Sequence, residues 1–160
     1  GLDSIRISLN SVQPDIYARY YRPRTYTFAD VHETARVMRR NGRWISLNYL
    51  VFPGVTDRQP EIDALHAFVA DVSVDMIQMR NLNIDPELYR SLVGEGRHGP
   101  GSGLLPMMHG LRARFPRLRF GYFNPPKQSW GDDPGPVTHP ANQPPRDFEY
   151  SAVRRTAMAT

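Results

Sequence analysis

The chain has 160 residues and contains no cysteine. Disulfides, thiolate metal sites and cysteine nucleophiles are therefore excluded within it. Its 20 basic residues include a single lysine, Lys127, so nearly all of the positive charge is carried by arginine. The arginines are scattered, and their two short clusters fall near the ends of predicted helices, where cations complement the helix dipole. Although the net charge is +4, we expect a solvated basic face and no nucleic-acid binding.

Long apolar runs are also lacking. No run approaches the ~20 residues that span a bilayer, and the beginning of the sequence has no signal-peptide pattern. We therefore expect a cytoplasmic protein with no membrane partner. The five histidines show neither the paired spacing nor the carboxylate partners that are typical of metal sites, and we expect no metal ligands.

What is present is an alternation of strands and helices. Apolar Ile5, Ile7 and Leu9 alternate with polar residues, which predicts a half-buried strand. Strand patterns are predicted over residues 4–9, 44–52, 74–82 and 118–123. Helices are predicted over 14–20, 28–40, 59–69, 86–93 and 104–115, most clearly where apolar residues recur at helical spacing, as Phe28, Val31, Ala35 and Met38 do. Strands that alternate with helices at this spacing predict an α/β fold of three to four βα units with parallel strands.

Polar residues recur near the ends of three successive strands. They are Ser8 and Asn10, Ser46 and Asn48, and Gln78 and Arg80. Parallel strands that are covered by helices on both faces would instead be continuous apolar runs. The pattern favours the mouth of a partial (half) TIM-like barrel. An open sheet with polar surface positions is the alternative.

The composition divides the chain into three parts. Residues 1–93 form the βα units, residues 94–126 an extension with a glycine-rich loop, a helix and a strand, and residues 127–160 a proline-rich C-terminal arm that is extended or disordered. The loop sequence Gly99-Pro100-Gly101-Ser102-Gly103 lacks the glycine pattern of a nucleophile elbow and the lysine of a phosphate-binding loop. We expect a flexible loop there.

Three ordered segments resemble a known family. They are LDSIRISLNS at residues 2–11, LNYLVFPGVTD at residues 47–57 followed by Glu61, and VDMIQMR at residues 74–80. They resemble the fourth, fifth and sixth strands of radical S-adenosylmethionine enzymes, in the branch that includes the molybdenum-cofactor cyclase A protein. The resemblance covers about residues 1–90.

The resemblance implies a six-stranded partial barrel whose first strand is followed by a CxxxCxxC loop that holds a four-iron cluster. Because this chain has no cysteine, we expect the cluster-binding N-terminal half of the barrel to lie outside it. The chain alone would then be inactive and have no catalytic residue. In the parent enzyme the reduced cluster would cleave S-adenosylmethionine to a 5′-deoxyadenosyl radical, which takes a hydrogen atom from an unknown small-molecule or peptide substrate.

The resemblance also implies cofactor contacts on the first two strands. Ser8 matches a residue that approaches the ribose or methionine part of S-adenosylmethionine, and Asn10 stands where relatives often have Asp. Arg22 offers a fork to the methionine carboxylate, with Arg24 as a competitor. Asn48 points to the same mouth. Cross-strand hydrogen bonds, water and salt bridges are the structural alternatives for these side chains.

The remaining contacts implied by the resemblance lie at the ends of the second and third strands. Phe52 and Gly54 would form a wall near adenine, with Gly54 permitting close approach of the backbone. Arg80 and Asn81 would close the adenine or substrate side. For Arg80 a structural salt bridge is the alternative.

A second function class stays open from the sequence. A partial barrel leaves two open sheet edges, and open edges favour pairing between chains. The alternative function is therefore a non-catalytic βα module for oligomerisation or binding, with a homodimer that completes the barrel.

Overall fold

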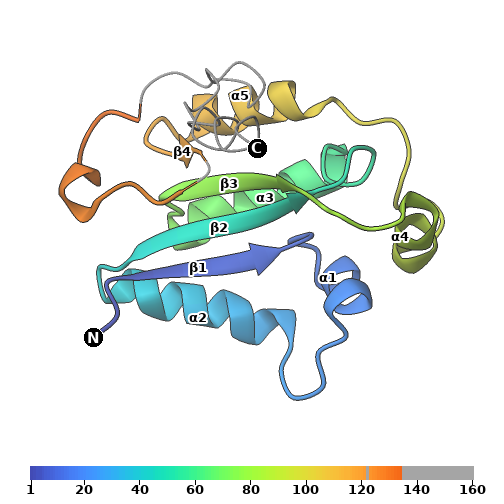
Figure 1. Cartoon of the computed structure of the whole chain (residues 1–160), viewed down its shortest axis with the longest axis horizontal. Helices are drawn as coiled ribbons and strands as arrows, with labels where there is room; N and C mark the ends of the chain where they lie inside the picture. Colours follow the sequence, from blue (N-terminus) through green and yellow to red (C-terminus); the bar gives the residue numbers. More distant parts are fainter. Residues whose placement is uncertain (122, 135–160) are drawn as a thin grey trace, which may run out of the picture.

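The computed structural model of the chain describes residues 1–121 and 123–134. Its centre is a parallel four-stranded sheet in the order β1-β2-β3-β4 (Figure 1). The strands are β1 (Ser4–Leu9), β2 (Trp44–Val51), β3 (Met76–Asn81) and β4 (Arg119–Phe120). The helices are α1 (Pro14–Tyr21), α2 (Phe28–Arg40), α3 (Gln59–Val72), α4 (Pro86–Val93) and α5 (Leu104–Arg114), followed by the short 3-10 helix η1 (Lys127–Ser129). The predicted α/β fold of parallel βα units is confirmed.

The sequential strand order places the long helices on one face of the sheet. Each strand pairs with the next one in the chain, and right-handed crossovers of that kind keep the long connecting helices α2, α3 and α5 on the same side. Alternate side chains of the strands, such as Ile7, Leu47 and Ile77, share a buried core with residues of α2, α3 and α5. We call the opposite side of the sheet the helix-free face.

Local sequence signals explain the helix boundaries. In α2, Thr27 and Asp30 form a capping box: the Thr27 backbone N–H donates to Asp30 Oδ2 over 2.7 Å. The helix ends at Asn41, and Gly42 follows with a φ of 65°. At α4, Asp85 accepts a hydrogen bond from the Leu88 backbone N–H. Both helices have the bounds that the sequence predicts.

A second, smaller core closes the carboxyl end of the helix-free face. It contains Phe52 and Leu82, which follow β2 and β3, together with Ile16 of α1 and Tyr89 of α4. Figure 1 shows α1 and α4 beside the arrowheads of the strands. The short helices α1 and α4 therefore cover this face at its carboxyl end, and the rest of the face carries no helix of the described α1 to α5.

The fourth strand is shorter than the predicted 118–123. It pairs only through Arg119 with Met76 and Phe120 with Ile77. The chain then leaves the sheet edge, and Asn124 accepts a hydrogen bond from Gln78 on the helix-free face. Of the predicted arm, residues 127–134 contain η1 and contact the sheet, whereas residues 135–160 lie outside the described residues.

No helix in the described part of the chain combines the length and the apolar character needed to cross a membrane.

Candidate functional site

A row of polar side chains crosses the middle of the helix-free face. Ser8, Asn48 and Gln78 are register partners on β1, β2 and β3. The Asn48 side-chain N–H donates to Ser8 Oγ over 3.1 Å. Gln78 Nε2 donates to Asn124 Oδ1 over 2.9 Å. Ser8 is exposed, Asn48 is half-buried and Gln78 is fully buried. The burial of these side chains therefore increases from the open edge of the sheet at β1 toward β3.

Arg80 adds a cation to the carboxyl side of this row. It follows Gln78 by two residues on β3 and therefore lies on the same face. Its guanidinium carbon lies 5.8 Å from the centre of the Phe123 ring. Asn81 is exposed at the end of β3, at a position of the opposite pleat. The structure thus places Ser8, Asn48 and Arg80 on one face of the sheet and Asn81 on the other.

The Asn10 side chain is not accessible beside the polar row. Its side chain is fully buried, and its Nδ2 donates to Tyr89 Oη over 3.0 Å. Burial raises the pKa of Tyr89 to about 12, so this hydroxyl stays protonated at neutral pH. Asn10 fastens the end of β1 to α4, and the predicted ribose contact stays a prediction.

Phe52 and Gly54 pack against protein groups. The Phe52 ring centre lies 4.7 Å from that of Tyr89. Gly54 has a φ of 84°, and its carbonyl accepts a hydrogen bond from the Gly99 backbone N–H over 2.9 Å. A Cβ on Gly54 would lie 2.7 Å from the Gly99 carbonyl oxygen. The close approach that glycine permits here is that of the glycine-rich loop.

The glycine-rich loop is held by Asp57. One carboxylate oxygen accepts from the Gly54 backbone N–H over 2.5 Å and the other from that of Gly103 over 3.0 Å. The backbone N–H of Ser102 donates to the Asp57 carbonyl over 2.9 Å. The structure therefore shows a docked loop where the sequence predicts a flexible one, because Asp57 supplies acceptors that the spacing alone does not reveal.

Arg22 lies on the other side of the sheet. It follows α1 in the left-handed region, with a φ of 49°. It lines a cavity of about 860 Å³ between α1, α2 and α3, whose walls include Tyr26, Phe28 and Phe68. Since α2 and α3 cover the face opposite to the polar row, the structure separates Arg22 from Ser8 and Asn48. Its competitor Arg24 is exposed in the loop between α1 and α2.

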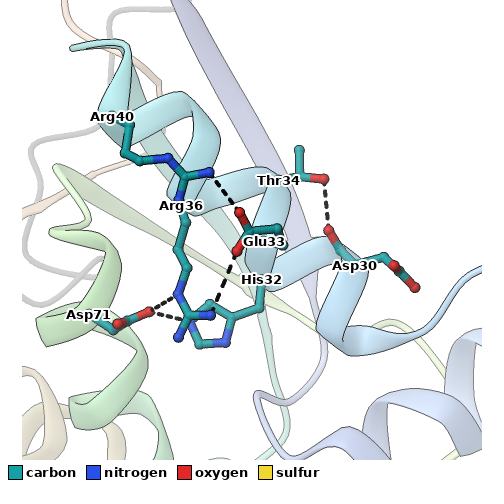
Figure 2. A network of polar contacts seen from close by, with 7 residues as sticks. All are labelled: Asp30, His32, Glu33, Thr34, Arg36, Arg40 and Asp71. Atoms are coloured by element: carbon teal, nitrogen blue, oxygen red, sulfur yellow. Dashed lines mark hydrogen bonds and ion pairs between the residues drawn. The ribbon is translucent and has the colours of Figure 1, made fainter.

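The charged groups beside this cavity pair with one another, as Figure 2 shows. His32 Nε2 and Arg36 Nε lie 2.8 Å and 2.6 Å from Asp71 Oδ2. The hydrogen bond from Arg36 is the main cause that lowers the pKa of Asp71. Arg40 pairs with Glu33 over 2.7 Å. The network links α2 to α3, and exposed pairs of this kind add little stability.

A buried carboxylate lies beneath the end of β1. In the sequence it appears only as an acidic residue near the beginning of a helix. Glu61 of α3 is fully buried. One of its oxygens accepts from Ser11 Oγ over 2.5 Å and from Gln13 Nε2 over 2.8 Å. The other accepts from the Val12 backbone N–H over 2.8 Å and from Tyr49 Oη over 2.7 Å. Burial raises the pKa of Glu61 despite these four donors.

Comparisons of the chain with protein-family models, with curated proteins and with solved structures give no match. Within residues 1–121 and 123–134, no group of three or more His, Cys, Asp or Glu side chains is arranged to hold a metal ion. The cofactor contacts implied by the family resemblance therefore stay predictions, and the geometry of the polar row is the evidence on which a function can be argued.

We predict that Glu61→Gln lowers the free energy of unfolding by about 1–3 kcal/mol, because the variant replaces one acceptor oxygen by an amide donor that faces other donors. Since the pKa of Glu61 is raised in the folded chain, folding gains from this group below its ordinary pKa and loses that gain as the pH rises. In urea titrations, the stability difference between wild type and variant should therefore narrow as the pH rises above the ordinary pKa of a glutamate. Glu87→Gln, at an exposed position of α4, is the control and should change stability by no more than ~0.5 kcal/mol. A difference that widens with pH would contradict the assigned direction.

We also predict opposite effects for two Gly→Ala substitutions. A Cβ on Gly101 would collide with the Asp57 carboxylate, whereas one on Gly110 in α5 meets nothing within 4 Å. Gly101→Ala should lower the free energy of unfolding by about 1–3 kcal/mol, and Gly110→Ala should raise it by ~0.5–1 kcal/mol, because glycine disfavours helix interiors. Equal effects of the two changes in thermal unfolding would show that the loop does not rest on Asp57.

Proposed function

We propose that this chain forms the C-terminal half of a radical S-adenosylmethionine barrel and supplies binding surface for the cofactor and the substrate. The observation that supports the proposal is the polar row of Ser8, Asn48 and Gln78 on the helix-free face of a sequentially wound parallel sheet. In βα barrels this face is the barrel interior, and sites lie toward the carboxyl ends of the strands.

The chemistry of the row suits a ligand that is rich in hydroxyl and amino-acid groups. Ser8 and Asn48 are already hydrogen-bonded to each other, which orients both side chains before a ligand arrives. Their remaining lone pairs and N–H groups can bond ribose hydroxyls or an ammonium group. Arg80, two residues beyond the row on β3, offers a donor fork for a carboxylate. This chain would bind and orient the ligand.

A partner half-barrel would hold the iron–sulfur cluster, since this chain has no cysteine. When bound, that cluster supplies the electron that cleaves the sulfonium. The edge of β1 that faces away from β2 pairs with no described strand, and it is the place where the partner half would continue the sheet. We place the protein in the cytoplasm, whose reducing conditions suit such a cluster. The substrate is a small molecule or a peptide.

The test uses the polypeptide encoded by the complete reading frame, purified without oxygen. The proposal expects a CxxxCxxC segment in that polypeptide, an iron–sulfur absorption that dithionite bleaches, and binding of S-adenosylmethionine. Ser8→Ala and Asn48→Ala should each weaken that binding about tenfold, the cost of one hydrogen bond of ~1.4 kcal/mol, and should leave the iron content unchanged.

The matched control is Ser4→Ala. Ser4 lies on the same strand and the same face as Ser8, four residues nearer the amino end, or about 13 Å away at the rise of a strand. It should bind S-adenosylmethionine like the wild type. Equal affinity in all four proteins, or a reading frame without the three-cysteine segment, would overturn the proposal.

The open edge of β1 supports a second candidate, a module that self-associates by strand pairing. The Asp3 carbonyl accepts from the Trp44 backbone N–H, so by strand alternation the backbone groups of Arg6 point away from β2 to the outer edge. In sedimentation of this chain, a β1-edge dimer should be lost in Arg6→Pro, which removes an outer N–H, and kept in Arg6→Ala. A monomer at all concentrations would exclude this candidate.

A further inference from the structure

The amino half of the helix-free face is covered by a segment that returns from β4. We call residues 123–130 the strap. Four of its contacts use side chains of the helix-free face: Gln78 with Asn124, Arg80 with Phe123, Arg119 with Ser129, and Trp44 with Trp130. A fifth pairs Lys127 Nζ with Asp3 Oδ1 over 3.1 Å. The strap thus spans the sheet from β3 to the beginning of β1.

The two ends of the strap are held differently. At its end, the Trp130 ring stacks on Trp44 with ring centres 4.8 Å apart and planes inclined by 23°. Arg119 also donates to the Ser129 carbonyl over 2.8 Å. These contacts bury Trp44, which keeps 5% of its exposure. At its beginning, the strap meets the polar row through one amide–amide bond, from Gln78 Nε2 to Asn124 Oδ1.

The contact at Gln78 is incomplete. Gln78 is fully buried, yet its Oε1 has no hydrogen-bond partner among the described residues. A buried acceptor without a partner is costly, so the closed strap satisfies only half of this amide. A ligand that brought an N–H or O–H donor to Gln78 Oε1 would satisfy the other half.

We propose that the strap is a built-in competitor of the ligand: it closes over Gln78 and Arg80 in the free chain and detaches at Asn124 when a ligand occupies the polar row. This inference rests on the proposed function and adds its regulation. Pro125 and Pro126 restrict the backbone behind Asn124, and the Ser129 backbone N–H bonds the Pro126 carbonyl over 2.9 Å. The strap therefore moves as a preformed unit, and its Trp130 end leaves Trp44 when its Asn124 end detaches.

The two tryptophans provide an optical test, since the chain has only these two and they stack on each other. The near-ultraviolet circular dichroism of Trp130→Phe, measured on the complete protein, gives the spectrum without the stacked pair. The difference between this spectrum and that of the wild type is the pair signal. Asn124→Ala lies away from the tryptophans and should weaken the pair signal without any ligand. In the wild type, the addition of S-adenosylmethionine should weaken the pair signal.

Affinity provides the second measurement. Trp130→Ala and Asn124→Ala should bind S-adenosylmethionine several-fold more tightly than the wild type, by at most the inverse of the open fraction of the strap. Gln128→Ala, at an exposed strap position, is the control and should change neither measurement. Far-ultraviolet circular dichroism confirms that each variant is folded.

The outcomes separate the two proposals. Binding with equal affinity in all variants, or binding that leaves the tryptophan signal unchanged, overturns the strap and leaves the proposed function standing. Binding in Trp130→Ala but not in the wild type supports both. Absence of binding in every variant removes the proposed function, and the competition falls with it.

Discussion

The hydrogen bonds that converge on Glu61 determine where the carboxyl ends of the first two strands lie. This carboxylate is buried at the beginning of α3, and its partners come from the turn after β1 and from Tyr49 of β2. A buried carboxyl group is tolerated only when its oxygens are hydrogen-bonded, and the turn at residues 11–13 supplies three of the four donors. These bonds hold the path of the chain into α1, and the neighbouring Asn10 makes the contact with α4.

The sheet has two unlike faces, and the rest of the chain is arranged to cover them. Long helices bury the apolar face. The other face is divided into three zones: the small core under α1 and α4, the polar row, and the strap with its tryptophan stack. The middle zone has both exposed and buried polar groups, with Ser8 exposed and Gln78 buried. A site placed there is bounded on two sides by parts of the same chain.

Alternation along the strands predicts the facing of Ser8, Asn48 and Arg80, because period-two patterns report the face of a sheet directly. The bounds of α2 and α4 likewise agree with the predicted ranges 28–40 and 86–93. These patterns cannot show which residues from distant parts of the sequence a side chain contacts. Asn10 meets Tyr89, 79 residues away, and Gly54 meets Gly99. Arg22, whose left-handed backbone ends α1, lies beside a cavity on the opposite face. The roles of Glu61 and the strap depend on such distant pairings.

The sequential order of the strands also bears on how the chain is made. Each strand after β1 pairs with the strand that precedes it in the chain, so these pairings do not depend on a distant later segment. Chains emerge from the ribosome amino end first, and folding can follow synthesis. Here β2 can dock on β1, and β3 on β2, while later residues are still being added. The strap follows all four strands in the chain, so it is added to a sheet that can already have formed.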